Sequence, residues 1–135
     1  MRLKKQIAIL ALGAGFAACT PQPATNLIED NMEFAQQQLR FAFDEIDYAI
    51  VNESPESRAK REKNGWGELT NPRNSEPDGT LNLVPSKDWT SGFFPGELWF
   101  LYEYTQNNFW KKKAQQHTDI LEKEKMNGST HDMGF

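Results

Sequence analysis

The segment that decides the fold is residues 26–51, NLIEDNMEFAQQQLRFAFDEIDYAIV. Its apolar side chains recur every three or four positions, which is the spacing of one face of an amphipathic helix. This stripe consists of Ile28, Met32, Ala35, Leu39, Ala42, Ile46 and Ile50. Asn26 is the predicted N-cap, with Glu29 in the position of a capping box. The bulk of Met32, Phe34 and Phe41 indicates that the helix packs against a substantial core.

The segments that follow predict more helices and one long loop. Residues 54–63 are polar and fit a short helix or a loop, whereas residues 65–85 are rich in Gly and Pro without a period, which predicts an irregular loop. A second helix is predicted over 89–105, capped by Thr90 or Ser91 with Pro95 in its first turn. A third is predicted over 109–126, with one face made of Trp110, Ala114, His117 and Leu121. No segment predicts a strand, so the expected class is all-α, organised as helix pairs.

Length and charge limit the function classes. At 135 residues the chain has the length of one domain, and its nine Phe and four Trp favour a packed core over disorder. The formal net charge is −4, and it becomes −7 without residues 1–18, which contain three basic residues and no acid. This acidic balance argues against nucleic acid as a partner. The single cysteine excludes an internal disulfide and a cysteine-rich metal site.

Residues 1–18 have the order of a secretory signal peptide. A basic start precedes an apolar run over residues 7–16, and small residues then lead to Cys19. The run is shorter than the roughly 20 residues of a membrane span. The exit resembles a bacterial lipobox, which implies cleavage after residue 18, acylation of Cys19 and attachment to a membrane. Residues 19–25 then form a proline-containing tether. The alternatives are a buried helix for the apolar run and an ordinary core residue for Cys19.

Two clusters contain residue types suited to chemistry, namely DWTSGFFPG at 88–96 and HDMGF at 131–135. Both stand at helix ends or in loops, where functional side chains collect on a helical scaffold. On residue types alone, simpler roles remain open. Trp89 could pack in the core, Asp132 could cap a helix, and His131 could stack on an aromatic ring.

The clusters and the segments between them resemble glycoside hydrolase family 88, the unsaturated glucuronyl hydrolases. The ordered series comprises Pro72-Arg73-Asn74, Asp78-Gly79, residues 88–105, Trp110 and the closing residues 131–135. The resemblance covers residues 26–135. It implies an (α/α)6 barrel of six helix hairpins, of which residues 26–135 would form an incomplete N-terminal portion.

The resemblance also implies a reaction. These enzymes release a 4,5-unsaturated uronic acid from oligosaccharides that polysaccharide lyases leave. A carboxylic acid protonates C4 of the vinyl ether, water adds at C5, and the hemiketal opens to release the sugar. Asp132 matches the aspartate of the family's His-Asp-(Leu/Met)-Gly-Phe motif and is the implied catalytic residue, with a nucleophile-like or substrate-orienting role. His131 and Trp89 match substrate-binding residues, Trp89 as a platform for a sugar ring. The implied proton donor is a second aspartate in a later helix hairpin.

The size of such a barrel sets a further expectation. About a dozen helices need well over 200 residues, so we expect the chain to be an N-terminal fragment that is inactive alone. The implied partners are an unsaturated uronic-acid oligosaccharide and a membrane reached through the lipid anchor, in the periplasm or outer membrane of a Gram-negative bacterium. No metal or organic cofactor is expected, because His117 and His131 lack clustered ligands. No oligomeric state is predicted. The alternative is a non-catalytic helical surface lipoprotein that binds a partner or a glycan.

Overall fold

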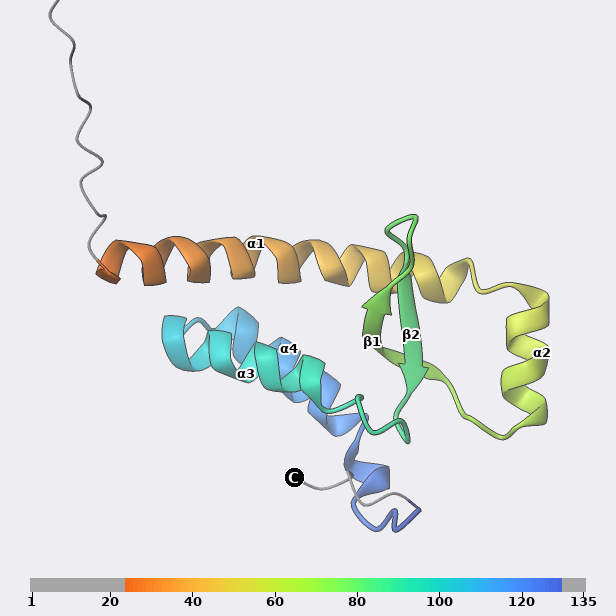
Figure 1. Ribbon diagram of the computed structural model, residues 1–135. Coiled ribbons are helices and arrows are strands. Elements are labelled where there is room, and N and C mark those ends of the chain that lie inside the picture. The colour runs from red at the N-terminus through yellow and green to blue at the C-terminus, as the bar shows by residue number, and fades with distance from the viewer. Residues whose placement is uncertain (1–23, 130–135) are drawn as a thin grey trace, which may run out of the picture.

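The computed structural model describes residues 24–129, and residues 1–23 and 130–135 lie outside this description. The elements are α1 (Ala24–Val51), α2 (Pro55–Lys63), β1 (Leu69–Ser75), β2 (Leu81–Pro85), α3 (Phe93–Thr105), α4 (Asn108–Asp119) and a short 3-10 helix, η1 (Glu122–Glu124). Helices account for most of these residues, which confirms the helical class. Figure 1 shows α1 as one long helix, with the α3–α4 pair beside its first half and the β-hairpin beside its second half.

The first helix buries the middle of the stripe that its sequence predicts, whereas Ile28 and Ile50 at the two ends of the stripe are exposed. Ile46 belongs to the core, and Met32 and Leu39 pack against it. Because α1 begins at Ala24, two residues before the predicted start, Asn26 lies inside the first turn and is not its cap.

The segment after α1 takes the helical option. α2 starts at Pro55, and the Ser54 hydroxyl caps it by accepting a hydrogen bond from the Ser57 amide at 3.1 Å.

The segment predicted as an irregular loop is instead a β-hairpin, so the prediction of no strand is wrong. β1 and β2 pair antiparallel from Leu69–Pro85 to Ser75–Leu81. The register shifts between Leu69 and Asn71 and again between Pro72 and Asn74. Such irregularities are where a strand accommodates a proline, which has no N–H for the ladder. The predicted turn at Pro77-Asp78-Gly79 is confirmed, since Gly79 has a φ of 90° and the Glu76 amide donates to the Thr80 carbonyl at 2.8 Å. The prediction of a turn at Pro72-Arg73-Asn74 is wrong, because these residues lie in β1.

The helix pair α3–α4 is joined by a tight connection at Gln106 and Asn107. Gln106 adopts the left-handed φ of 54°, and the Asn107 side chain caps α4 by accepting from the Phe109 amide at 2.9 Å. Pro95 lies in the first turn of α3, as predicted. α3 begins after Gly92, later than expected, and α4 ends at Asp119, before the predicted end near residue 126.

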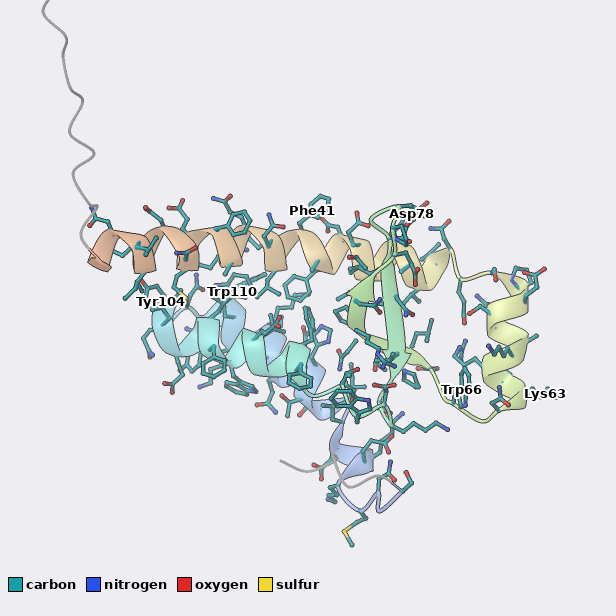
Figure 2. The ribbon with its side chains drawn as sticks, viewed as in Figure 1. Phe41, Lys63, Trp66, Asp78, Tyr104 and Trp110 are labelled. Carbon is teal, nitrogen blue, oxygen red and sulfur yellow. The ribbon has the colours of Figure 1, made fainter. Side chains whose placement is uncertain are left out.

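An aromatic cluster joins α1 to the helix pair. The Phe43 ring centroid lies 5.8 Å from that of Phe94 on α3 and 6.4 Å from that of Trp110 on α4. Trp110 of α4 is fully buried and faces α1 (Figure 2), where its indole N–H donates to Oε1 of the Gln36 side chain at 3.2 Å. Burying aromatic rings of this size contributes much of a small core's stability.

Two apolar faces remain exposed within residues 24–129. One runs along α1 at intervals of seven residues, and the other follows α3 and its preceding turn. They consist of Leu27, Phe34, Phe41 and Tyr48 on α1, and of Trp89, Phe93, Phe100 and Tyr104 on the second face. Exposed apolar patches of this kind mark surfaces that other elements or molecules cover. No helix in this part of the chain has the length and apolar character to cross a bilayer.

Candidate functional site

The turn at residues 86–92 presents Trp89 and is fixed by hydrogen bonds from within. One Asp88 carboxylate oxygen accepts from the Thr90 amide at 2.9 Å and from the Thr90 hydroxyl at 2.6 Å. The Ser91 hydroxyl donates to the Ser86 carbonyl at 2.7 Å. Thr90 and Ser91 are buried, whereas Trp89 is 48% exposed and packs edge-on against Phe93. The turn therefore exposes the Trp89 indole, while the polar side chains of Thr90 and Ser91 next to it are buried.

A chain of buried hydrogen bonds, the Asn71–His117 relay, connects this turn to β1 and α4. Asn71 on β1 has no exposed surface, and its amide N–H donates to the Ser91 carbonyl at 2.8 Å. Its side-chain oxygen lies 2.7 Å from Nδ1 of His117 on α4. Because an amide oxygen only accepts, His117 must carry its proton on Nδ1. The relay thus fixes the Trp89 turn to β1 and α4 together.

His117 is suited to this role as a neutral ring. Burial lowers the pKa of His117, nearby Lys113 lowers it further, and Asp47 opposes both. The ring packs edge-on against Phe94 with 4.9 Å between centroids. The neutral imidazole donates from Nδ1 to Asn71 without placing a charge among the aromatic rings.

Trp89 lines a groove of about 970 Å³ between α2, the β-hairpin and the turn. A second tryptophan, Trp66, lines it too and lies beside α2 (Figure 2). The basic side chains along the groove are Lys60, Arg61, Arg73 and Lys87, and the acidic ones are Glu53, Glu76 and Asp88. Four basic against three acidic groups give the groove a slight positive balance in a chain of net charge −4.

The basic groups of the groove differ in how tightly they are paired. Arg61 forms a bidentate pair with Glu53, at 2.9 Å from Nε and 2.8 Å from Nη2, and this contact lowers the pKa of the Glu53 carboxyl. Arg73 lies 3.5 Å from Asp88, and its side chain is 44% exposed. The loosely held Arg73 guanidinium is therefore available to meet an acidic ligand.

The C-terminal part of the described chain returns to the same turn. The Ser86 hydroxyl donates to Oε1 of Glu124 at 2.6 Å, and Oε2 of Glu124 accepts from the Asn127 side chain at 3.0 Å. Ser129, the last described residue, lines the groove with Trp89. In the sequence, His131 and Asp132 follow it by two and three positions.

A smaller cavity of about 500 Å³ lies on the other side of Arg73. Glu97 of α3 lines it together with Phe93 and Phe94, and burial raises the pKa of the Glu97 carboxyl. Glu97 is not among the site residues predicted from the sequence. Its position one helical turn after Phe93, on a nearly apolar helix, is the signal that could have found it.

Of the predicted site residues, the structure places Trp89. Within residues 24–129 its side chain is exposed and does not pack in the core. His131, Asp132 and Cys19 lie outside the described residues. Within residues 24–129 no group of three or more His, Cys, Asp or Glu side chains is arranged to hold a metal ion.

The resemblance to glycoside hydrolase family 88 can be tested against known proteins. No family model matches the chain. It is 60% identical over 55 residues to an unsaturated glucuronyl hydrolase of Formosa agariphila, a match that covers 41% of this chain and 14% of the relative. It is 33% identical over 63 residues to an unsaturated chondroitin disaccharide hydrolase of Streptococcus pneumoniae, covering 43% of this chain and 15% of the relative. The chain is thus similar in sequence to part of each of these two hydrolases.

One solved structure also aligns with part of the chain. The crystal structure of an unsaturated glucuronyl hydrolase specific for heparin aligns over 76% of this chain and 24% of its own, with 31% identity and a TM-score of 0.47. The matches to the two curated unsaturated glucuronyl and chondroitin disaccharide hydrolases span about one seventh of each relative's length. These two sequence matches confirm the resemblance to glycoside hydrolase family 88.

Sequence reasoning missed the groove's second tryptophan and its cations. Gly65-Trp66-Gly67 was read as part of a loop, and Arg73 as part of a turn. A tryptophan between two glycines in a polar segment is the signal that could have drawn attention to Trp66.

Proposed function

We propose that the protein is an unsaturated glucuronyl hydrolase, which releases a 4,5-unsaturated uronic acid from lyase-generated oligosaccharides. The single observation that carries the proposal is the 60% identity to a hydrolase of that name. The groove supports it, because an exposed indole on a fixed turn suits the apolar face of a sugar ring.

Each residue of the proposed site has a proposed role in binding or catalysis. Trp89 stacks on the unsaturated sugar, and Arg73, 44% exposed in the groove, attracts an acid group of the substrate. His131 lines the pocket, and Asp132 orients the substrate or supports the group that protonates C4. In an (α/α)6 barrel, further helix pairs would cover the apolar face of α1 and the Phe100 and Tyr104 part of the second face, which leaves Trp89 open to the groove.

The test uses the protein expressed from its complete gene. It is incubated with a panel of unsaturated uronyl disaccharides that includes the chondroitin disaccharide. Hydration of the C4=C5 bond removes its ultraviolet absorbance, so we expect the absorbance to fall and the free second sugar to accumulate in equal amount. Stable absorbance with every disaccharide would refute the activity and favour the non-catalytic lipoprotein.

We further propose that Cys19 is acylated and holds the protein at the cell envelope. The motivation is the basic start, the apolar run over residues 7–16 and the small residues before the single cysteine. Wild-type protein should incorporate labelled fatty acid in a bacterial host and sediment with membranes, whereas Cys19→Ala should not be labelled. Thr20→Ala, one position further on, is the matched control and should behave as wild type. A labelled Cys19→Ala protein would rule out this anchor.

A further inference from the structure

Trp66 stands at the tip of a tight turn that follows α2. The flanking glycines have left-handed φ values of 59° for Gly65 and 79° for Gly67, a region that side-chain-bearing residues rarely adopt. The Trp66 amide donates to the Arg61 carbonyl at 3.0 Å. The backbone on both sides of the indole is therefore fixed.

Two cationic side chains from different parts of the chain secure the same turn. Arg61 Nη1 donates to the Gly67 carbonyl at 2.6 Å, and Lys87 Nζ donates to the Gly65 carbonyl at 2.8 Å. Arg61 is itself fixed by its bidentate pair with Glu53, whose side chain is only 6% exposed. Lys87 precedes Asp88 and Trp89 in the sequence, so one residue connects the two tryptophan-bearing turns.

The hydrogen bonds from Arg61 and Lys87 fix the turn but do not bury the Trp66 indole. Trp66 remains 39% exposed and lines the groove that Trp89 also lines, and the Lys60 ammonium lies 5.8 Å from its ring centroid. Single exposed aromatic residues are common on protein surfaces, but the backbone on both sides of Trp66 is held by specific hydrogen bonds. An exposed indole on a fixed backbone and beside a cation is prepared for a ligand, because the turn loses little conformational entropy on binding.

We propose that Trp66 is a second saccharide platform, which stacks on a sugar of an acidic oligosaccharide beyond the unit that contacts Trp89. This inference rests on the proposed function, since it assigns the far end of the same groove. It predicts that the protein prefers substrates longer than a disaccharide, and that this preference depends on the indole of Trp66.

The test compares an unsaturated disaccharide with the tetrasaccharide of the same polymer, using the protein expressed from its complete gene. The readout is the ratio of kcat/KM for the tetrasaccharide to kcat/KM for the disaccharide. An aromatic contact contributes about 0.5–1.5 kcal/mol, so Trp66→Ala should lower this ratio roughly fivefold, mainly through KM. Trp66→Leu, which keeps apolar bulk for folding, should lower it similarly, and Trp66→Phe should retain most of it.

Phe41→Ala is the matched control for loss of an aromatic side chain, because Phe41 of α1 lies outside the groove lining, and it should leave the ratio unchanged even where both rates fall. A ratio that stays at the wild-type value in both Trp66→Ala and Trp66→Leu would overturn the inference while the proposed function stands. An equal loss on both substrates would also overturn it. Failure of the wild-type protein on both substrates would refute the proposed function, and the inference with it.

Discussion

Asp132→Asn is expected to abolish release of the unsaturated uronic acid by the protein expressed from its complete gene, while the fold stays intact. The substitution keeps the size and the hydrogen-bonding reach of the side chain but removes its charge. If Asp132 orients the substrate or supports the proton donor, the loss should be on the order of 100-fold or more in rate. If Asp132 only caps a helix, Asn should serve almost equally well, because the two residues cap with similar strength.

The same substitution at Asp78 is the matched control. Asp78 lies in the hairpin turn, where its carboxylate accepts from the Thr80 amide at 3.0 Å and from the Thr80 hydroxyl at 2.7 Å. Asp78→Asn should leave the rate close to wild type. The assay is loss of absorbance from an unsaturated disaccharide, run beside a melting curve. Near-normal turnover by well-folded Asp132→Asn protein would remove this residue from the site and weaken the mechanism with it.

Asn71→Leu should destabilise the protein strongly. Leucine has a similar size but leaves the Ser91 carbonyl and the His117 Nδ1–H buried without their partner. A buried polar group without a partner costs about 1–3 kcal/mol, so the two together should lower the free energy of unfolding by about 2–6 kcal/mol.

Asn74→Leu on the same strand provides the comparison. Asn74 is exposed, and its side-chain oxygen accepts from Asn82 at 3.1 Å. Its replacement should change the free energy of unfolding by about 0.5 kcal/mol or less. Both values come from urea unfolding curves. Equal stability of the two variants would show that the Asn71–His117 relay does not support the Trp89 turn.

The helices could be predicted because their apolar spacing is a local property. The stripe on α1 and the buried face of α4, with Trp110 and Ala114, are visible in any window of about a dozen residues. The hairpin could not be predicted in this way. Its strands, LTNPRNS and LNLVP, contain prolines and asparagines that interrupt the alternation of a half-buried strand, and their pairing becomes evident only in three dimensions.

The residues of the site also differ in whether the sequence alone could identify them. Trp89 and Asp132 were identified from an ordered series of motifs, which a sequence displays directly. The burial of Asn71 depends on residues 20 and 46 positions away, Ser91 and His117, and no local pattern reveals it. The hydrogen bonds that fix the Trp66 turn likewise come from Arg61 and Lys87, which precede and follow the hairpin in the sequence.

The hydrogen bond from Ser86 to Glu124 links two segments that protein engineering has to move together. A graft that moved only residues 86–96 to another scaffold would leave the buried Ser86 hydroxyl without its acceptor. A graft of only the segment that leads to HDMGF would leave Glu124 without the Ser86 donor. Chimaeras between this chain and its relatives should therefore take residues 86–92 and 122–135 from the same parent.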